Sequence, residues 1–365
     1  MQKIKILVDG RWFDSYYSGV STYIKGLYND LSKDHNFEVT IVGNSIEKLK
    51  EEFPENIKFI KLNSKSNLKR LYYDIPKLIK KYNFDYAHFQ YICPILKPCK
   101  YIVTLHDLLF LEYKKSFPLS FILKNSFLFY ISSLRTDIIL TVSEYSKNQI
   151  VKIFKTNSKK IHITPNGILK KFLEGTNSIN IKTKYNLGEY ILFVSRLEPR
   201  KNHLALIKSF VDLALFNNYQ LILIGKKTIS NVGLDEYISS LNDSIKSRII
   251  FIENTSEEDL HGFYSNASLF VYPSLSEGFG IPPIEAISCG TKTICSNATA
   301  LADFDFLSTY QFDPNNINEL KDKILFSLND KSYPIENYKS IINERYNWSN
   351  ISNSYKKFLI NDFNQ

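Results

Sequence analysis

Short apolar runs alternate with longer amphipathic segments along the whole chain. In the first half they lie at 4–9, 38–42, 58–62, 86–89, 101–105, 138–142 and 161–164, and in the second at 190–194, 220–224, 249–253, 269–272, 293–296 and 310–312. Runs that are apolar throughout are typical of strands covered on both faces, as in parallel sheets with helices on each side. The alternation therefore predicts an α/β protein built from βαβ units.

The segment 170–185 is the expected domain boundary. It contains Gly175, shows no apolar period, and follows the turn Pro165-Asn166-Gly167. A chain of 365 residues can form two cores, so we expect doubly wound domains at 1–170 and 171–347. Ligands of such sheets bind at the carboxyl ends of strands where the strand order reverses. Two such domains facing each other would bind a ligand in the cleft between them.

The composition narrows the class of partner. Hydrophobic residues make up 44% and charged residues 23% of the chain, which argues against large-scale disorder. The net charge of +9 favours nucleic acid, an anionic membrane or phosphorylated small molecules as partners. The basic clusters at 65–70, 77–81 and 152–160 are not gathered with aromatic residues in one nucleic-acid-binding module, so no nucleic-acid partner is expected. Solvated helix faces are the alternative for each cluster.

Cysteines and apolar segments indicate the compartment. The four cysteines form no Cys-x-x-Cys pair, which predicts reduced, partly buried thiols and no zinc site. The N-terminal residues reach a charge too early for a signal peptide. The most apolar helix candidate, 117–134, is interrupted by Lys124 and Asn125, so no membrane span is expected. We therefore expect a cytoplasmic protein, with peripheral attachment to the cell membrane as a further possibility.

The segment 271–286 carries the strongest motif. A predicted strand ends, a loop with two glycines follows, and Pro282-Pro283 opens a helix where proline is well tolerated. Glycines let a backbone approach a ligand closely, and loop amides at a helix N-terminus can bind a diphosphate. The residues expected to donate are Gly278, Phe279, Gly280 and Ile281.

Two glutamates flank this loop, with Glu277 inside it and Glu285 eight residues later, expected in the first helical turn. Carboxylates accept hydrogen bonds from sugar and ribose hydroxyls. We expect Glu277 to meet the transferred sugar and Glu285 the ribose. The alternative is that Glu285 only complements the helix dipole and that Glu277 is solvated.

Further candidates follow other predicted strands. Arg196 and Lys201 come after the strand at 190–194, on an expected solvated rim, where two cations could neutralise a departing diphosphate; an ordinary rim is the alternative. His106 and Asp107 follow the strand at 101–105, although a lone histidine is more often structural. Gly19 is expected in a loop after the first strand that could pass close to the phosphates, although glycine in a loop needs no function.

The Glu-x7-Glu pair in its Ser-Glu-Gly-Phe-Gly-x-Pro-Pro-x-Glu-Ala setting resembles the retaining glycosyltransferases of family 4, which have the GT-B fold of two Rossmann-like domains. The segments 9–11, 18–20, 163–167, 193–202 and 221–225 resemble the family in turn. The resemblance implies that Arg196 and Lys201 hold the donor diphosphate, that His106 lies near the transferred sugar, and that Asp107 orients its loop. It also implies that the C-terminal helix 348–365 packs back on the first domain.

The family resemblance gives a set of site residues. Catalysis is assigned to His106, Arg196, Lys201 and Glu277. Donor binding is assigned to Gly19, Arg196, Lys201, Glu277, Gly278, Phe279, Gly280, Ile281 and Glu285.

The resemblance also implies a reaction, namely front-face transfer with retention, in which the leaving phosphate helps deprotonate the acceptor hydroxyl. Similarity to bacterial mannosyl-, rhamnosyl- and hexosyltransferases of O-antigen assembly implies GDP-mannose as the donor. It implies a glycan or a lipid-linked saccharide as the acceptor.

No cofactor or metal is expected, because no Asp-x-Asp follows a strand in a suitable place and Asp303-Phe304-Asp305 comes too late. Another sugar enzyme of the same fold, such as an epimerase, would be expected to show acid–base residues in both domains. A non-catalytic partner subunit would be expected to lose part of the charged set, which is complete here. The basic clusters 65–70 and 77–81 beside the apolar segment 117–134 suit attachment to anionic lipid.

Overall fold

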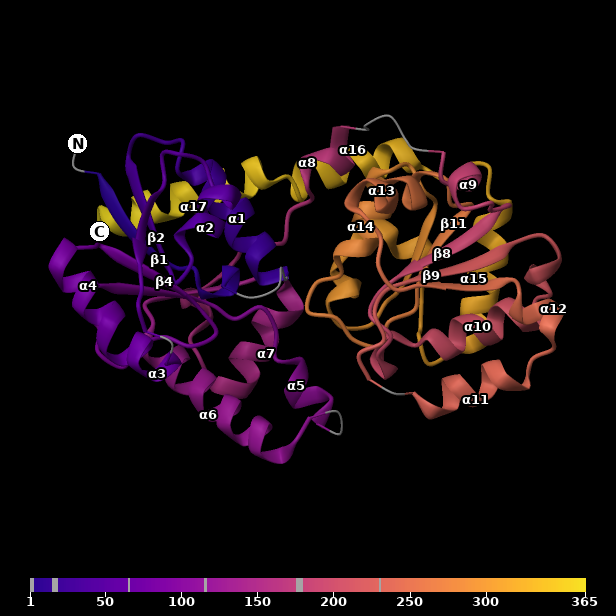
Figure 1. Cartoon of the computed structure of the whole chain (residues 1–365), viewed down its shortest axis with the longest axis horizontal. Helices are drawn as coiled ribbons and strands as arrows, with labels where there is room; N and C mark the ends of the chain where they lie inside the picture. Colours follow the sequence, from indigo (N-terminus) through magenta and orange to yellow (C-terminus); the bar gives the residue numbers. More distant parts are fainter. Residues whose placement is uncertain (1–2, 15–18, 65, 115–116, 175–179, 230) are drawn as a thin grey trace. The chain divides into compact units, whose positions relative to one another are not determined.

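The computed structural model describes residues 3–14, 19–64, 66–114, 117–174, 180–229 and 231–365. The chain forms two compact units (Figure 1). Unit 1 comprises Met1–Gly167 together with Tyr346–Gln365, and unit 2 comprises Ile168–Arg345. The last segment of the chain thus belongs with the first.

Unit 1 contains a parallel sheet of seven strands in the order β3-β2-β1-β4-β5-β6-β7. The strands are β1 (Ile4–Asp9), β2 (Phe37–Gly43), β3 (Lys58–Lys61), β4 (Tyr86–Gln90), β5 (Lys100–Thr104), β6 (Ile138–Thr141) and β7 (Ile161–Ile163). The helices are α1 (Gly19–Leu31), α2 (Ile46–Glu52), α3 (Asn67–Lys69), α4 (Ile75–Tyr82), α5 (Leu109–Glu112), α6 (Leu119–Arg135), α7 (Glu144–Phe154) and α17 (Trp348–Phe363).

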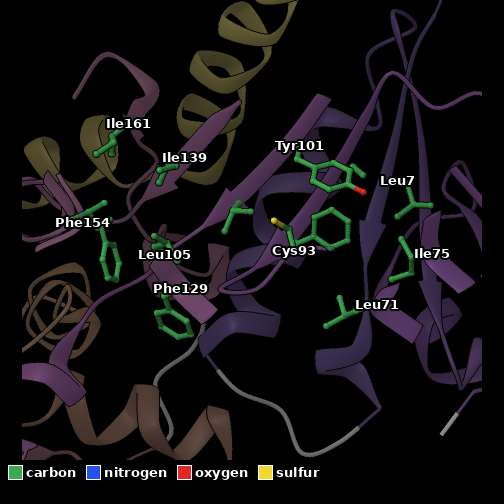
Figure 2. Packing of buried hydrophobic residues seen from close by; sticks show 14 of the residues in the cluster. Leu7, Leu71, Ile75, Cys93, Tyr101, Leu105, Phe129, Ile139, Phe154 and Ile161 are labelled. Atoms are coloured by element: carbon green, nitrogen blue, oxygen red, sulfur yellow. The ribbon is translucent and has the colours of Figure 1, made fainter. Parts of the chain in front are cut away.

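The central strands of unit 1 are buried on both faces. All five residues of β4 are buried, and so are all four of β6, which explains why their sequences show apolar runs and not alternation. Helical side chains complete the core: Figure 2 shows Phe129 of α6 and Ile75 of α4 in the cluster that also contains Tyr101 of β5.

The C-terminal helix α17 packs along α1. Its first residue, Trp348, lies where a side chain on Gly26 would be, since a Cβ atom built on Gly26 would stand 2.1 Å from the indole. Only glycine allows this close approach. Ser352 strengthens the contact, because its hydroxyl donates to the carbonyl of Leu27 at 3.1 Å. The end of the chain is therefore part of the first core.

Unit 2 contains a parallel sheet of six strands in the order β10-β9-β8-β11-β12-β13. The strands are β8 (Tyr190–Val194), β9 (Gln220–Ile224), β10 (Ile249–Ile252), β11 (Leu269–Tyr272), β12 (Thr293–Ser296) and β13 (Gln311–Phe312). The helices are α8 (Lys170–Glu174), α9 (Ile181–Lys184), α10 (His203–Asp212), α11 (Val232–Ser240), α12 (Asp243–Lys246), α13 (Glu257–Ser265), α14 (Ile281–Ser288), α15 (Ile317–Asn329) and α16 (Ile335–Arg345).

The predicted strands are confirmed throughout, and both units are doubly wound α/β folds. The strand order reverses between β1 and β4 in unit 1 and between β8 and β11 in unit 2. Loops that leave neighbouring strands at such a point run in opposite directions and open a space for side chains between them. The four cysteines are free, as expected.

Candidate active site

Lys201 and Glu277 meet where the strand order of unit 2 reverses. Lys201 closes a one-turn helix after β8, and Glu277 lies in the loop after β11. Lys201 Nζ lies 2.5 Å from Glu277 Oε1, and the same ammonium group donates to the hydroxyl of Tyr272 at 3.0 Å. Tyr272 in turn donates to Glu277 Oε1 at 3.0 Å. Lys201 and Tyr272 thus share Oε1 of the Glu277 carboxylate.

Arg200 belongs to the same cluster, although it was not among the residues expected from the sequence. Its Nη1 donates to Glu277 Oε2 at 3.2 Å and to the carbonyl of Ser276 at 2.9 Å. Its Nε donates to Glu198 at 2.9 Å. The sequence did contain a signal for Arg200, because it is adjacent to Lys201 and follows the same strand.

Glu277 is a buried carboxylate held in its charged form. Only 7% of the residue is exposed. Burial by itself would raise the pKa of Glu277, but the cations of Lys201 and Arg200 outweigh burial and hold that pKa below its ordinary value. The cluster therefore combines two cations and one fixed acceptor.

We expected Arg196 and Lys201 to lie on a solvated rim. This expectation is wrong for Lys201, because only 7% of that residue is exposed. Its ammonium group contacts both Tyr272 and Glu277. Arg196 does fit the expectation: its side chain is 67% exposed, and its Nη1 lies 3.9 Å from Glu198 Oε1. The two cations of the sequence motif thus have different environments, and Arg196 does not share Lys201's contacts with Glu277.

The glycine loop leads directly into α14. Gly280 has a φ of 102°, and a Cβ atom there would stand 2.4 Å from Leu301 Cδ2, so this position needs glycine. Because Pro282 and Pro283 lack N–H groups, the helix N-terminus offers fewer donors than an ordinary one. Gly280 and Ile281, at the start of this helix, do have backbone N–H groups.

Glu285 lies on α14 apart from the cluster around Glu277. It is the fifth residue of the helix, beyond the first turn in which it was expected. Tyr264 on α13 donates to its Oε2 at 3.0 Å. Burial raises the pKa of Glu285 to about 7, against the opposing effect of that hydrogen bond. A carboxyl group of this kind changes its charge near neutral pH.

In unit 1, His106 follows β5 and is buried beside the ring of Tyr23, at a centroid distance of 4.9 Å. Its Nε2 lies 2.8 Å from Oε1 of Gln90, the last residue of β4. Burial lowers the pKa of His106 to about 3, so the imidazole is neutral. A carbonyl oxygen can only accept, so Nε2 carries the proton and Nδ1 is left as an acceptor.

Gln90 connects His106 to a chain of polar side chains that sequence reasoning missed. Gln90 Nε2 lies 3.3 Å from His88 Nε2, and His88 Nδ1 lies 2.7 Å from the hydroxyl of Tyr28. Tyr28 lies 3.3 Å from the hydroxyl of Tyr355 on α17. The alternation of β4 was a possible signal, because His88 and Gln90 are two residues apart and project from the same face of the strand.

The remaining predicted residues are placed as follows. Gly19 is the exposed first residue of α1 and not a loop residue, and nothing lies within 4 Å of a Cβ atom built there; Ser18 lies outside the described residues. Asp107 accepts from the amide of Leu109 at 3.1 Å, so it orders its loop as expected. In the described ranges, no three His, Cys, Asp or Glu side chains gather as a metal site would require.

Two family models together match almost the whole chain. The model described as "Glycosyltransferase Family 4" matches residues 17–169, and the one described as "Glycosyl transferases group 1" matches residues 176–348. The O-antigen chain mannosyltransferase RfbU of Salmonella typhimurium is 31% identical over 259 residues, which cover 67% of this chain and 68% of that protein. The chain belongs to glycosyltransferase family 4.

Other relatives match over a smaller part of their length. The O-antigen chain mannosyltransferase B of Escherichia coli is 30% identical over 231 residues, covering 60% of each chain. The match with this relative therefore spans less than two thirds of its length. The crystal structure of a glycosyltransferase from Rickettsia africae covers 98% of both chains with a TM-score of 0.73 at 19% identity. That likeness shows the fold, which is GT-B.

The two polar clusters divide between the family models. His106 and Gln90 lie in the part matched by the family 4 model, and Lys201, Arg200, Glu277 and Glu285 lie in the part matched by the group 1 model. In the part of the chain that the structure describes, no helix combines the length and apolar character needed to cross a membrane.

Proposed function

We propose that the protein is a retaining hexosyltransferase that uses a nucleotide-sugar donor, with GDP-mannose as the first candidate. The acceptor is a glycan or a lipid-linked saccharide in the synthesis of a cell-surface polysaccharide. The names of the O-antigen mannosyltransferases among the relatives support the choice of sugar and pathway.

The observation that carries the proposal is the cluster formed by Lys201, Arg200 and Glu277 where the strand order of unit 2 reverses. Departure of the nucleoside diphosphate leaves negative charge that fixed cations can stabilise. We assign diphosphate binding to the side chains of Lys201 and Arg196 and to the loop amides as far as Ile281. When a phosphate takes the place of Glu277 at Lys201, Arg200 still holds the carboxylate in position.

Glu277 then has an acceptor oxygen for a hydroxyl of the transferred sugar, and Glu285 accepts from the ribose hydroxyls. His106 is assigned to the transferred sugar, because its neutral imidazole leaves Nδ1 as an acceptor. In retaining front-face transfer the leaving phosphate oxygen removes the proton from the acceptor hydroxyl, so no protein base is assigned. No step uses a metal ion.

A thermal-shift screen with the full chain tests donor binding. GDP-mannose, UDP-glucose, dTDP-rhamnose and ADP-glucose are added separately, and the donor should raise the melting temperature, since a ligand at a hundred times its Kd stabilises the native state by about 2.7 kcal/mol. Transfer to a saccharide acceptor is then followed by NMR, and the new linkage should keep the donor's anomeric configuration. If no nucleotide sugar stabilises the protein and none is consumed, the proposal fails.

A further inference from the structure

We propose that unit 1 docks on an anionic lipid surface through the outer face of α6. Five large apolar side chains form this face, here called the α6 stripe: Leu119, Leu123, Phe127, Tyr130 and Leu134. Their spacing of three or four residues places them on one side of the helix. Each is between 41% and 69% exposed. Figure 1 shows α6 along one edge of unit 1.

The α6 stripe is separate from the side of the helix that packs in the core. Ile122, Phe129 and Ser132 are buried, and Phe129 stacks on Tyr91 with a centroid distance of 5.1 Å. A surface helix normally presents charged or polar residues opposite its buried side. α6 presents leucine and aromatic residues there instead, and a contiguous exposed apolar surface of this kind marks an interaction site.

Three polar side chains of α6 donate hydrogen bonds to the backbone of the helix itself. Asn125 donates to the carbonyl of Phe121 at 2.8 Å, Ser126 to that of Ile122 at 2.6 Å, and Ser133 to that of Tyr130 at 2.7 Å. The hydroxyls of Ser126 and Ser133 and one N–H of the Asn125 amide are thus satisfied without water. This lowers the cost of placing the helix surface at the boundary between lipid headgroups and acyl chains.

The loop after β4 also carries exposed apolar side chains. It is fixed to α6 by the amide of Cys93, which donates to Ser132 Oγ at 3.1 Å. Further along this loop, Ile95 is 46% and Leu96 is 60% exposed. Exposed apolar side chains of unit 1 are therefore found on two segments of chain that share a fixed contact.

Charge favours an anionic bilayer over an apolar groove of a protein. The sequence from residue 113 to 136 contains no Asp or Glu, while Lys124 and Arg135, both exposed, directly follow Leu123 and Leu134 of the stripe. Unit 1 has 28 lysines and arginines against 16 aspartates and glutamates, whereas unit 2 has 18 against 21. The positive excess of the chain lies entirely in the unit that carries the stripe, as attraction to anionic headgroups requires.

The acidic residues that border this range are already paired. Asp137 accepts from Lys97 at 2.7 Å, and Glu112 accepts from the hydroxyl of Tyr145. The cluster 65–70 expected from the sequence contributes less than its composition suggests. Arg70 is 2% exposed and pairs with Asp9 and Asp14, so it is not available to lipid, and Lys65 lies outside the described residues.

Vesicle flotation of the full chain tests the proposal. At low salt the protein should float with vesicles of phosphatidylcholine containing phosphatidylglycerol, and much less with phosphatidylcholine alone. The double variant Leu123→Glu with Phe127→Glu should reduce the bound fraction about tenfold or more, because two apolar contacts become charges. The variant Lys124→Gln with Arg135→Gln should weaken binding several-fold and reduce its dependence on salt.

The matched control is Val232→Glu with Leu325→Glu, which places the same charges on exposed apolar positions of unit 2. This control should bind lipid at least as well as Lys124→Gln with Arg135→Gln.

Thermal unfolding and nucleotide-sugar binding should be unchanged in the stripe variant, Leu123→Glu with Phe127→Glu, so its flotation result is independent of the proposed function. Equal flotation with neutral and anionic vesicles, or undiminished flotation of the stripe variant, overturns the proposal. A dimer in ultracentrifugation that the stripe variant abolishes also overturns it, since a second copy then covers the face.

Discussion

Lys201 Nζ and Glu277 Oε1 lie 2.5 Å apart inside unit 2, and both side chains are nearly excluded from solvent. The contact joins the loops after β8 and β11, the strands between which the sheet reverses. Lys201 is therefore both a candidate phosphate ligand and part of the folded core. Removing Lys201 should therefore affect stability as well as activity, whereas removing the exposed Arg196 should affect activity alone.

The pair of variants Lys201→Ala and Arg196→Ala separates these two effects. Lys201→Ala leaves a buried carboxylate with one cation fewer and should cost on the order of 3 kcal/mol in the free energy of unfolding. Arg196→Ala should leave stability nearly unchanged and lower turnover by roughly a hundredfold through lost charge stabilisation. Urea unfolding and initial-rate assays measure both. Wild-type turnover in Arg196→Ala would remove it from the site.

Gln90 should act as a positioning residue for His106. Gln90→Leu removes the acceptor that fixes the imidazole tautomer and should lower kcat by about tenfold or more. Gln90→Glu keeps an acceptor but adds a charge that favours imidazolium, so the pKa of His106 should rise from about 3. Activity of this variant should then fall as pH decreases, where the wild type shows no such limb from His106. Identical pH–rate profiles for Gln90→Glu and the wild type would show that the contact has no part in the reaction.

Glu285 should make stability depend on pH. Its pKa in the folded protein, about 7, is above its ordinary value of 4.5. The stability it contributes is therefore fully present below the unfolded-state pKa and is lost as pH rises through the folded-state pKa. The free energy of unfolding of Glu285→Gln, relative to wild type, should increase between pH 5 and pH 8. Urea titrations at each pH provide the measurement, and a constant difference would contradict the burial of an ionisable group there.

The same carboxyl group should govern nucleotide affinity. If ionised Glu285 accepts from the ribose, the affinity for nucleoside diphosphate should rise from pH 6 to pH 8 more steeply in wild type than in Glu285→Gln, in calorimetric titrations. Phosphate ionisation is common to both proteins, so the difference belongs to Glu285. At pH 8, Glu285→Gln should mainly raise the donor KM; equal pH dependence in both proteins would exclude the ribose assignment.

Glu277→Gln should mainly lower kcat, because its contacts serve the reacting sugar. The variant should bind a nucleoside diphosphate no more weakly than wild type does, since losing the carboxylate leaves Lys201 and Arg200 more attractive to phosphate. Isothermal titration with the diphosphate and steady-state kinetics give the two quantities. Weaker diphosphate binding with unchanged kcat would exchange the roles of Glu277 and Glu285.

Activity should persist in excess EDTA, because the cations of Arg196 and Lys201 are assigned the charge stabilisation that a metal could otherwise supply. Initial rates with and without EDTA, and after addition of Mg²⁺ or Mn²⁺, test this. Loss of activity with EDTA and its recovery with either ion would require a metal ligand set in the active enzyme.

The amino-acid sequence alone determined the strands, the α/β class and the glycine loop with its two glutamates. These features are local: apolar runs reflect burial on both faces of a strand, and glycine and proline restrict the backbone where they stand. Gly280 at the start of α14 is an example: the sequence places a glycine there, and the structure gives it a φ of 102°, which favours glycine.

Only the tertiary structure decided how the charged side chains are paired and buried. Lys201 and Glu277 are 76 residues apart, and from the sequence alone both charged side chains could be solvated. They are buried together because β8 and β11 are neighbouring strands in the sheet. Gln90 meets His106 because β4 and β5 pair in parallel, and Tyr355 reaches this region because α17 returns to unit 1. Burial and pKa depend on neighbours from every packed element, so the local pattern of a sequence cannot contain them.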